Sequence, residues 1–197
     1  MNLDEFLGKM LNVRANALVK LLAIQRFSDP EPFKGEIDLN GRSFDMSQLE
    51  VCRANELNYN IRLDQLIIDI SRSIISDSYC VYERYLTILI HGNPEELKSN
   101  SGPDEFIKKY KNVISGDTKN FFNFCKYIRN GLMHYEGICS VKNIIKYNFR
   151  GINFDTELLI GKPLPINPGI AITINEELAI SVRNMIVSLG IDCPKKY

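Results

Sequence analysis

Apolar residues recur at helical spacing along most of the chain. Over residues 3–27 they return every three or four positions, which predicts a first helix. Residues 47–91 contain neither proline nor glycine and carry a second broad apolar stripe. A straight helix of that length would measure roughly 68 Å at 1.5 Å per residue, so we expect a bend or break near residues 58–60. The pattern therefore predicts a mainly α-helical protein.

Shorter elements are predicted on either side of that stripe. Residues 35–45 contain an Asn-Gly pair between apolar positions, which favours a small hairpin or an ordered loop. A short helix is expected over residues 104–114, after a break rich in Gly and Pro. The next helix is rich in aromatic residues; Asp117 or Thr118 is its predicted N-cap, and it should extend to about Tyr135.

After Gly137 the apolar period changes from 3.6 to 2. Apolar residues alternate with polar ones in two runs: Ile145, Tyr147 and Phe149, then Ile170, Ile172 and Ile174. This alternation predicts two strands paired as an antiparallel β ribbon. Residues 175–177 then predict the start of a last helix. We therefore expect one helical domain over residues 1–197, with a ribbon appendage at about 141–175 and a C-terminal helix at about 176–189.

Composition is that of an ordinary globular protein, with 45% hydrophobic and 24% charged residues. The five cysteines are widely spaced without a Cys-x-x-Cys pair, so reduced thiols are expected and no zinc site. The acidic N-terminus lacks the basic and apolar regions of a signal peptide, and no apolar run approaches the ~20 residues of a membrane span. A cytoplasmic protein without membrane contact is expected.

The balanced net charge conceals a basic segment. The chain has 24 basic and 24 acidic residues, which excludes a globally basic nucleic-acid binder. Residues 105–150, however, carry nine basic and three acidic side chains. Tyrosines are interleaved with these cations, a composition that suits single-stranded RNA. A solvated helix face with aromatic residues in the core is the alternative for the cations at 108–111.

The two histidines have different settings. His91 stands at a predicted helix C-terminus, where a structural role is expected. His134 follows Arg129 by five residues and Asn130 by four. On a regular helix Asn130 and His134 lie about 40° apart, whereas Arg129 and His134 lie about 140° apart. We therefore expect either a helix loosened at Gly131 or a second copy of the motif across a two-fold axis.

This motif resembles that of a known family. The hexapeptide Arg129-Asn130-Gly131-Leu132-Met133-His134 ends an aromatic-rich helix. It resembles the Arg-x4–6-His motif of HEPN domains (higher eukaryotes and prokaryotes nucleotide-binding), in which asparagine commonly follows the arginine. The predicted helix order over about residues 1–136 is similar to that of the family, and the ribbon with its closing helix is similar to stand-alone bacterial members.

The resemblance implies an up-and-down HEPN-like bundle that acts as a homodimeric, metal-independent endoribonuclease without a cofactor. The motifs of the two protomers would face one another in one cleft and form a composite dimer site. His134 would then act in acid–base chemistry, Arg129 would contact the scissile phosphate and Asn130 would orient both. Cleavage would leave a 2′,3′-cyclic phosphate. The expected setting is stress or defence against phages and plasmids, with an antitoxin or regulatory protein as a possible partner. Toxin-type members often carry a tyrosine two residues after the histidine, whereas this chain has Glu136 there.

The side chains beside the motif complete the predicted site. Lys126, Tyr127 and Tyr135 are the expected RNA-binding residues. Glu83, a lone acid on the long apolar stripe, could reach the cleft and orient a cation. It is interpreted instead as a solvated or ion-paired side chain and is left out of the site.

Other interpretations of the motif remain open. Asn130-Gly131 could instead end the helix as a C-cap, which would leave His134 in the following turn. A catalytically silent HEPN module that binds RNA or a protein is the alternative function, and a purely structural helical protein is a third.

Overall fold

Helices make up most of the described chain, which covers residues 1–28, 36–38, 43–45, 63–92 and 102–191 of the computed structural model. The helices are α1 (Leu3–Ser28), α3 (Leu63–His91), α4 (Gly102–Lys109), α5 (Gly116–His134) and α6 (Pro168–Leu189). The remaining elements are two antiparallel hairpins, β1 (Glu36–Asp38) with β2 (Ser43–Asp45) and β3 (Lys146–Phe149) with β4 (Ile152–Asp155), and a 3-10 turn η2 (Thr156–Leu159). The mainly helical prediction is confirmed.

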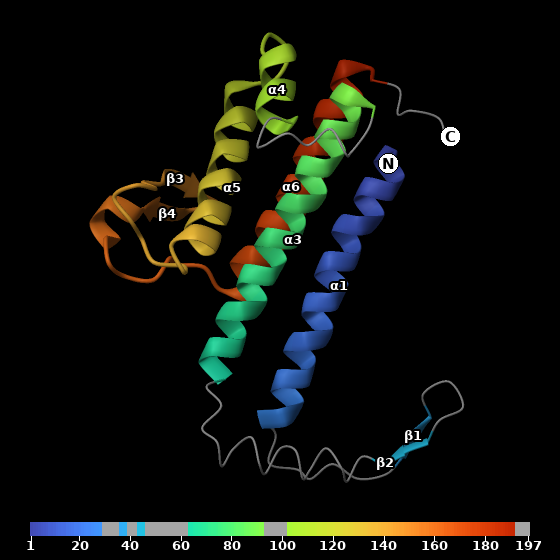
Figure 1. The fold of residues 1–197 in the computed structure, drawn as a ribbon, viewed down its shortest axis with the longest axis vertical. Helices are drawn as coiled ribbons and strands as arrows, with labels where there is room; N and C mark the ends of the chain where they lie inside the picture. The colour runs from blue at the N-terminus through green and yellow to red at the C-terminus, as the bar shows by residue number, and fades with distance from the viewer. Residues whose placement is uncertain (29–35, 39–42, 46–62, 93–101, 192–197) are drawn as a thin grey trace.

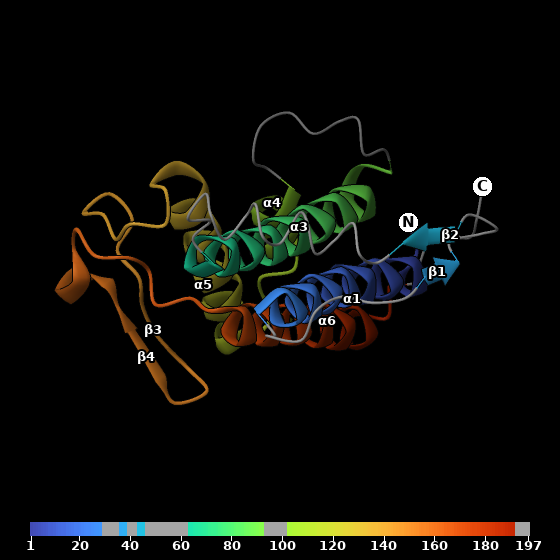
Figure 2. The ribbon, with the colours of Figure 1, turned by 90° about the horizontal axis from the view of Figure 1, so that it is seen from below.

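Helix α3 is the centre of the fold. It packs against α1, α4, α5 and α6, and α1 also contacts α6. Figure 1 shows α1 on one side of α3 and α4 and α5 on the other, with α6 beside α3. In the view of Figure 2, the β3–β4 hairpin projects beyond α5, away from α1 and α6. None of the helices in the described ranges combines the length and the apolar character that crossing a membrane requires.

Aromatic side chains join α3 to its neighbours on both sides. Phe6 of α1 stacks on Tyr85 of α3, with ring centroids 4.6 Å apart. One helical turn earlier, Tyr82 contacts Phe122 of α5 at 5.1 Å. All four side chains are at most 2% exposed. Because such large rings bury much apolar area, these contacts fix which face α5 turns toward α3.

The β3–β4 hairpin packs on the opposite side of α5. Phe124 of α5 stacks on Tyr147 at 4.6 Å and meets Phe154 edge-on at 5.0 Å. The turn between the strands consists of Arg150 (φ 49°) and Gly151 (φ 83°). Two consecutive positive φ angles define a type I′ turn, whose twist matches that of the paired strands.

The prediction that the strand near residues 145–149 pairs with residues 170–174 is wrong. Strand β3 pairs with β4, which places Tyr147 opposite Phe154, and the alternating isoleucines at 170, 172 and 174 lie in helix α6 instead. This helix begins at Pro168, where the side chain of Asn167 accepts a hydrogen bond from the Ile170 amide at 2.9 Å. The ribbon therefore spans residues 146–155 rather than 141–175, and the last helix begins eight residues before the predicted 176.

Several smaller boundaries also differ from the predictions. Ser115, rather than Asp117 or Thr118, is the N-cap of α5, since its hydroxyl accepts from the Thr118 amide at 3.1 Å. Helix α4 is shorter than the predicted 104–114. The first helix, the hairpin within 35–45 and the end of α5 near Tyr135 are confirmed. The expected break near 58–60 lies outside the described residues.

Gly131 lies inside α5 and is not a C-cap. The helix continues to His134, and Gly131 is not among the residues with positive φ. A Cβ atom at this position would lie 2.6 Å from Leu164 Cδ1 and 3.1 Å from the side-chain nitrogen of Asn143. The glycine therefore lets the loop after β4 approach the helix closely. The motif is carried on a continuous helix.

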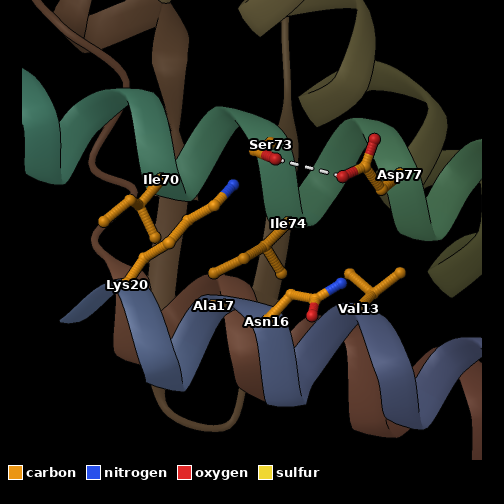
Figure 3. Close-up of a pocket in the computed structure, with 8 residues that line it drawn as sticks. All are labelled: Val13, Asn16, Ala17, Lys20, Ile70, Ser73, Ile74 and Asp77. Carbon is orange, nitrogen blue, oxygen red and sulfur yellow. Dashed lines mark hydrogen bonds between the residues drawn. The ribbon is translucent and has the colours of Figure 1, made fainter. Parts of the chain in front are cut away.

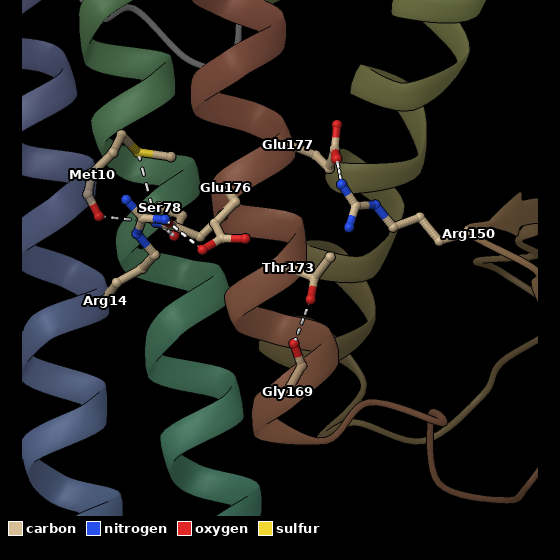
Figure 4. Close-up of polar contacts among 9 residues, drawn as sticks. Met10, Arg14, Ser78, Arg150, Gly169, Thr173, Glu176 and Glu177 are labelled. Atoms are coloured by element: carbon tan, nitrogen blue, oxygen red, sulfur yellow. Dashed lines mark hydrogen bonds and ion pairs between the residues drawn. The ribbon is translucent and has the colours of Figure 1, made fainter.

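A buried polar group connects three helices. Asn175 of α6 is fully buried, and its side-chain amide donates to Ser78 Oγ of α3 at 2.7 Å and to the Met10 carbonyl of α1 at 3.3 Å. Figure 4 shows Met10 and Ser78 together with the nearby ion pair between Arg14 and Glu176, at 2.6 Å. Because each partner belongs to a different helix, these bonds favour one axial register of α1, α3 and α6.

Replacing this amide tests its contribution to stability. Asn175→Ala removes both hydrogen bonds and leaves a cavity, so we expect a loss of about 2 kcal/mol in the free energy of unfolding. Asn184→Ala, at an exposed position of the same helix, should change it by less than about 0.5 kcal/mol. Urea unfolding followed by circular dichroism measures both; equal stability of the two variants would contradict the role of Asn175.

Candidate active site

The motif lines a cavity of about 250 Å³ between α3, α4 and α5. Helix α5 contributes Lys126, Arg129, Asn130 and His134 to its wall. These four side chains lie on the side of α5 opposite the buried Phe121, Cys125, Ile128 and Leu132. The same amphipathic pattern that packs α5 into the core therefore gathers its polar side chains in one cavity.

The three motif residues are in contact within one chain. Arg129 Nη1 donates to Asn130 Oδ1 at 3.1 Å and lies 3.3 Å from His134 Nε2. The expectation that Arg129 points away from His134 on a regular helix is wrong, because the guanidinium at the end of the long arginine side chain reaches the His134 ring. Neither a loosened helix nor a second copy of the motif is needed to bring them together.

The contact with Arg129 determines which nitrogen of the His134 ring carries the proton. A guanidinium has N–H donors and no acceptor. In its contact with Arg129, His134 Nε2 must therefore accept, and the ring proton then lies on Nδ1. A neutral imidazole is a base that can receive a proton at Nε2 once the Arg129 N–H turns away from that nitrogen.

Helix α3 supplies the other side of the cavity with Tyr79, which the sequence did not suggest, and with Glu83. Leaving Glu83 out of the predicted site was wrong, because its side chain lines the cavity. The Arg129 guanidinium lies 5.9 Å from the centroid of the Tyr79 ring, within range of a cation–π interaction. Burial raises the pKa of Tyr79 well above its usual range, so its phenol stays protonated. The four-residue spacing of Tyr79 and Glu83 places both on one face of α3, which was the only signal available in the sequence.

Burial and nearby charges act in opposite directions on the pKa of the Glu83 carboxyl group. Partial burial raises its pKa above the ordinary 4.5, whereas the positive charges of Arg129 and Lys126 lower it and the negative charge of Asp104 raises it. The net shift is upward, so desolvation outweighs the two cations. Such a group exchanges a proton closer to neutral pH than an exposed glutamate does.

The three predicted RNA-binding residues lie in three different places. Lys126 lines the cavity and pairs with Asp104 of α4 at 2.7 Å. Tyr127 is 44% exposed, and its carbonyl accepts a hydrogen bond from Asn143 at 2.8 Å. Tyr135 is the C-cap of α5 and lines an adjoining groove together with His134. Neither tyrosine belongs to the described wall of the cavity itself.

The basic segment is partly neutralised by acids outside it. Lys126 pairs with Asp104, Lys146 with Glu157 and Arg150 with Glu177, the last shown in Figure 4. Exposed pairs of this kind add little stability, but they do reduce the positive field of residues 105–150. The positive field is therefore lowered in the cavity wall by Asp104 and at the β3–β4 hairpin by Glu157 and Glu177.

His91 lies apart from the cavity. Its Nε2 is 2.9 Å from Glu105 Oε2, a contact that joins the end of α3 to α4. The structural role predicted for His91 agrees with this geometry.

A second, smaller cavity of about 140 Å³ lies between α1 and α3. In Figure 3, Ser73 donates to Asp77 at 3.0 Å while Lys20 extends from α1 toward α3. Ile74 and other aliphatic side chains complete its wall. This cavity contains no histidine, so the acid–base chemistry is assigned to the first one.

The described residues contain no group of three or more His, Cys, Asp or Glu side chains placed to hold a metal ion. Three cysteines, Cys80, Cys125 and Cys139, are free in the same ranges.

No family model, no curated protein and no solved structure matches this chain. Its function is therefore inferred from the residues of the cavity.

The raised pKa of Glu83 predicts that the Glu83→Gln variant is more stable than wild type, by an amount that depends on pH. Since the folded protein binds this proton more tightly than the unfolded chain, ionised Glu83 costs stability, and the cost appears as the pH rises through and above 4.5. Glu83→Gln should therefore be more stable than wild type at neutral pH, with the difference vanishing at about pH 4. Thermal unfolding at both pH values measures it. A variant less stable than wild type at neutral pH would contradict the desolvated carboxyl.

Proposed function

We propose that this protein is an endoribonuclease that cleaves RNA at the cavity between α3, α4 and α5. The observation that supports this most strongly is the contact of Arg129 with both Asn130 and His134 in one cavity wall. A base and a planar cation are among the groups that transesterification of a phosphodiester requires, and the Asn130 amide can hold that cation in place. The resemblance of the motif to that of HEPN ribonucleases points to the same reaction.

In the proposed reaction the ribose 2′-oxygen attacks the adjacent phosphorus. His134 Nε2 takes the 2′-hydroxyl proton as the new O–P bond forms. Arg129 turns its N–H groups toward the non-bridging phosphoryl oxygens, where a guanidinium fork can donate two parallel hydrogen bonds. Asn130, which accepts from Arg129, holds the guanidinium in place. The products are a 2′,3′-cyclic phosphate and a free 5′-hydroxyl.

The leaving 5′-oxygen needs a proton when its bond to phosphorus breaks. Glu83 is suited to supply it, because its raised pKa keeps a larger fraction of the carboxyl protonated than in an exposed glutamate. Glu83 and His134 belong to α3 and α5, on different walls of the cavity. A phosphate bound at Arg129 would lie between them, so that one chain provides both the base and the acid.

A homodimer and a defence role follow from the resemblance rather than from this geometry. HEPN ribonucleases act as dimers, and stand-alone bacterial members serve in stress or defence, some under control of an antitoxin. We propose the same setting for this chain, in the cytoplasm. Because Arg129 reaches His134 within one chain, each protomer of such a dimer would keep a complete set of motif residues.

The two histidines provide a matched test of the reaction. His134→Ala removes the base and should slow RNA cleavage by at least about 100-fold. His91→Ala, which only breaks the contact with Glu105, should leave the rate unchanged. Purified protein is incubated with RNA in excess chelator, and the 2′,3′-cyclic phosphate ends are counted. Cleavage that persists in His134→Ala would contradict the proposal, and RNA binding without cleavage by wild type would favour the silent module.

A mixing experiment separates a site within one chain from a site shared by two. We expect light scattering to give twice the 22.6 kDa of the chain. Mixing His134→Ala with Arg129→Ala protein should restore no activity, since each protomer then lacks one residue of its own set. Restored activity would contradict the single-chain site and support a composite one; a monomeric wild type would contradict the dimer.

A further inference from the structure

A groove adjoins the cavity on the far side of His134. It has a volume of about 450 Å³ and lies between the loop that follows α5 and Ile160–Gly161. His134 lines both the cavity and the groove. A strand that places a phosphate at His134 can therefore place a neighbouring nucleotide in the groove.

Backbone hydrogen bonds hold the two walls of the groove at a fixed separation. The Cys139 amide donates to the Lys162 carbonyl at 2.8 Å, and the Gly161 amide donates back to the Cys139 carbonyl at 3.0 Å. Arg72 of α3 braces the start of the loop by donating to the Glu136 carbonyl. Gly137 makes this possible, because a Cβ there would lie 3.2 Å from Arg72 Nη2. The groove is therefore formed before any ligand binds.

The groove has apolar walls that stay exposed. Ile138, Val141 and Ile160 are 38%, 67% and 45% exposed, and Tyr135 lies beside them. Apolar side chains that leave this much surface in water next to a reactive histidine suit a flat, partly apolar ligand. An unstacked nucleobase has such a face, and RNA-binding proteins take up single bases in this way.

Glu136 is the charged side chain of the groove. It adopts the left-handed backbone conformation, with φ 54°, which glycine or asparagine usually occupies because of the steric cost to other residues. Its carboxylate has no hydrogen bond or ion pair within the part of the chain that the structure describes. The positive φ ends α5 directly after its C-cap, and the Glu136 carbonyl accepts from Arg72, so the backbone of this residue serves the fold. Its carboxylate remains open to a ligand in the groove.

We propose that the groove binds the nucleobase next to the scissile phosphate and that Glu136 selects guanine. This inference rests on the proposed ribonuclease function. The Watson–Crick edge of guanine carries adjacent N1–H and N2–H donors, which match the two oxygens of one carboxylate. Adenine, cytosine and uracil each place an acceptor beside their donor on that edge, so a carboxylate pairs with them less well.

Base preference in cleavage tests the role of Glu136. With RNAs that differ only at the nucleotides flanking the cleaved bond, wild type should show a kcat/KM at least about tenfold higher for guanine at one of the two positions. Glu136→Gly should lose this preference while the other bases are still cleaved, and its melting temperature should rise because glycine tolerates the positive φ. Glu136→Gln should lose most of the preference.

Arg150→Gly is the matched control. It also replaces a residue in the left-handed conformation, with φ 49°, but in the β3–β4 turn, so the guanine preference should be unchanged. Cleavage without base preference in wild type, or a preference that survives in Glu136→Gly, would overturn the inference while leaving the ribonuclease function intact.

Ligand binding separates the groove from the reaction. Guanosine 3′-monophosphate is titrated into wild-type protein, and the methyl NMR signals of Ile138, Val141 and Ile160 are followed. We expect these signals to shift, with an affinity about tenfold higher than for the other three 3′-monophosphates.

Selective binding without RNA cleavage would refute the proposed function and leave the groove as a guanine-nucleotide site. Cleavage with unmoved methyl signals would overturn the groove assignment alone. A second copy covering the groove would also leave the signals unmoved and would make the particle mass depend on concentration, which again overturns it.

Discussion

The packing of α5 against α3 determines where the reactive groups of this protein lie. Phe122 and Ile128 of α5 are buried in the core, and Phe122 contacts Tyr82 of α3. With that face fixed, the helical period places Arg129, Asn130 and His134 on the side that meets the cavity. Tyr79 precedes Tyr82 by less than one turn of α3. The contact of Tyr82 with α5 therefore also positions the Tyr79 ring, which Arg129 faces at 5.9 Å. The cavity is therefore a consequence of core packing.

The spacing of apolar residues along the chain predicted the helices correctly but predicted one strand wrongly. The sequence predicted α1, α5 and the stretch 63–91 of α3, because apolar residues recur along each of them at helical spacing. It mistook residues 170–174 for a strand. Helix α6 packs against α1 and α3 with one face, which carries Ala171, Ile174 and Leu178. Ile170 and Ile172 are only partly buried and lie at the edges of that face, so the three isoleucines alternate by coincidence. The Asn167-Pro168 pair, a cap followed by a proline in the first turn, was the signal that decided the boundary.

The motif could be recognised in the sequence, but its surroundings could not. Arg129, Asn130 and His134 are close in the chain, and their residue types suggested the chemistry. Glu83 and Tyr79 reach the same cavity only through the pairing of α3 with α5, which no local pattern encodes. The helical-wheel argument against a contact of Arg129 with His134 considered Cα directions and neglected the reach of a guanidinium, which the 3.3 Å separation makes plain. Side-chain length and tertiary pairing were the missing information.

The central claim is that RNA binds with a phosphate at Arg129 and His134 of one chain. Because the chain has only two histidines, the imidazole NMR spectrum reports on this directly. An RNA made uncleavable by a 2′-deoxy nucleotide at the cleavage position is titrated into wild-type protein, with His91, held by Glu105, as the internal reference. We predict that the His134 ring signals shift in proportion to the bound fraction while those of His91 stay in place. Saturated binding with His134 unmoved would contradict the account.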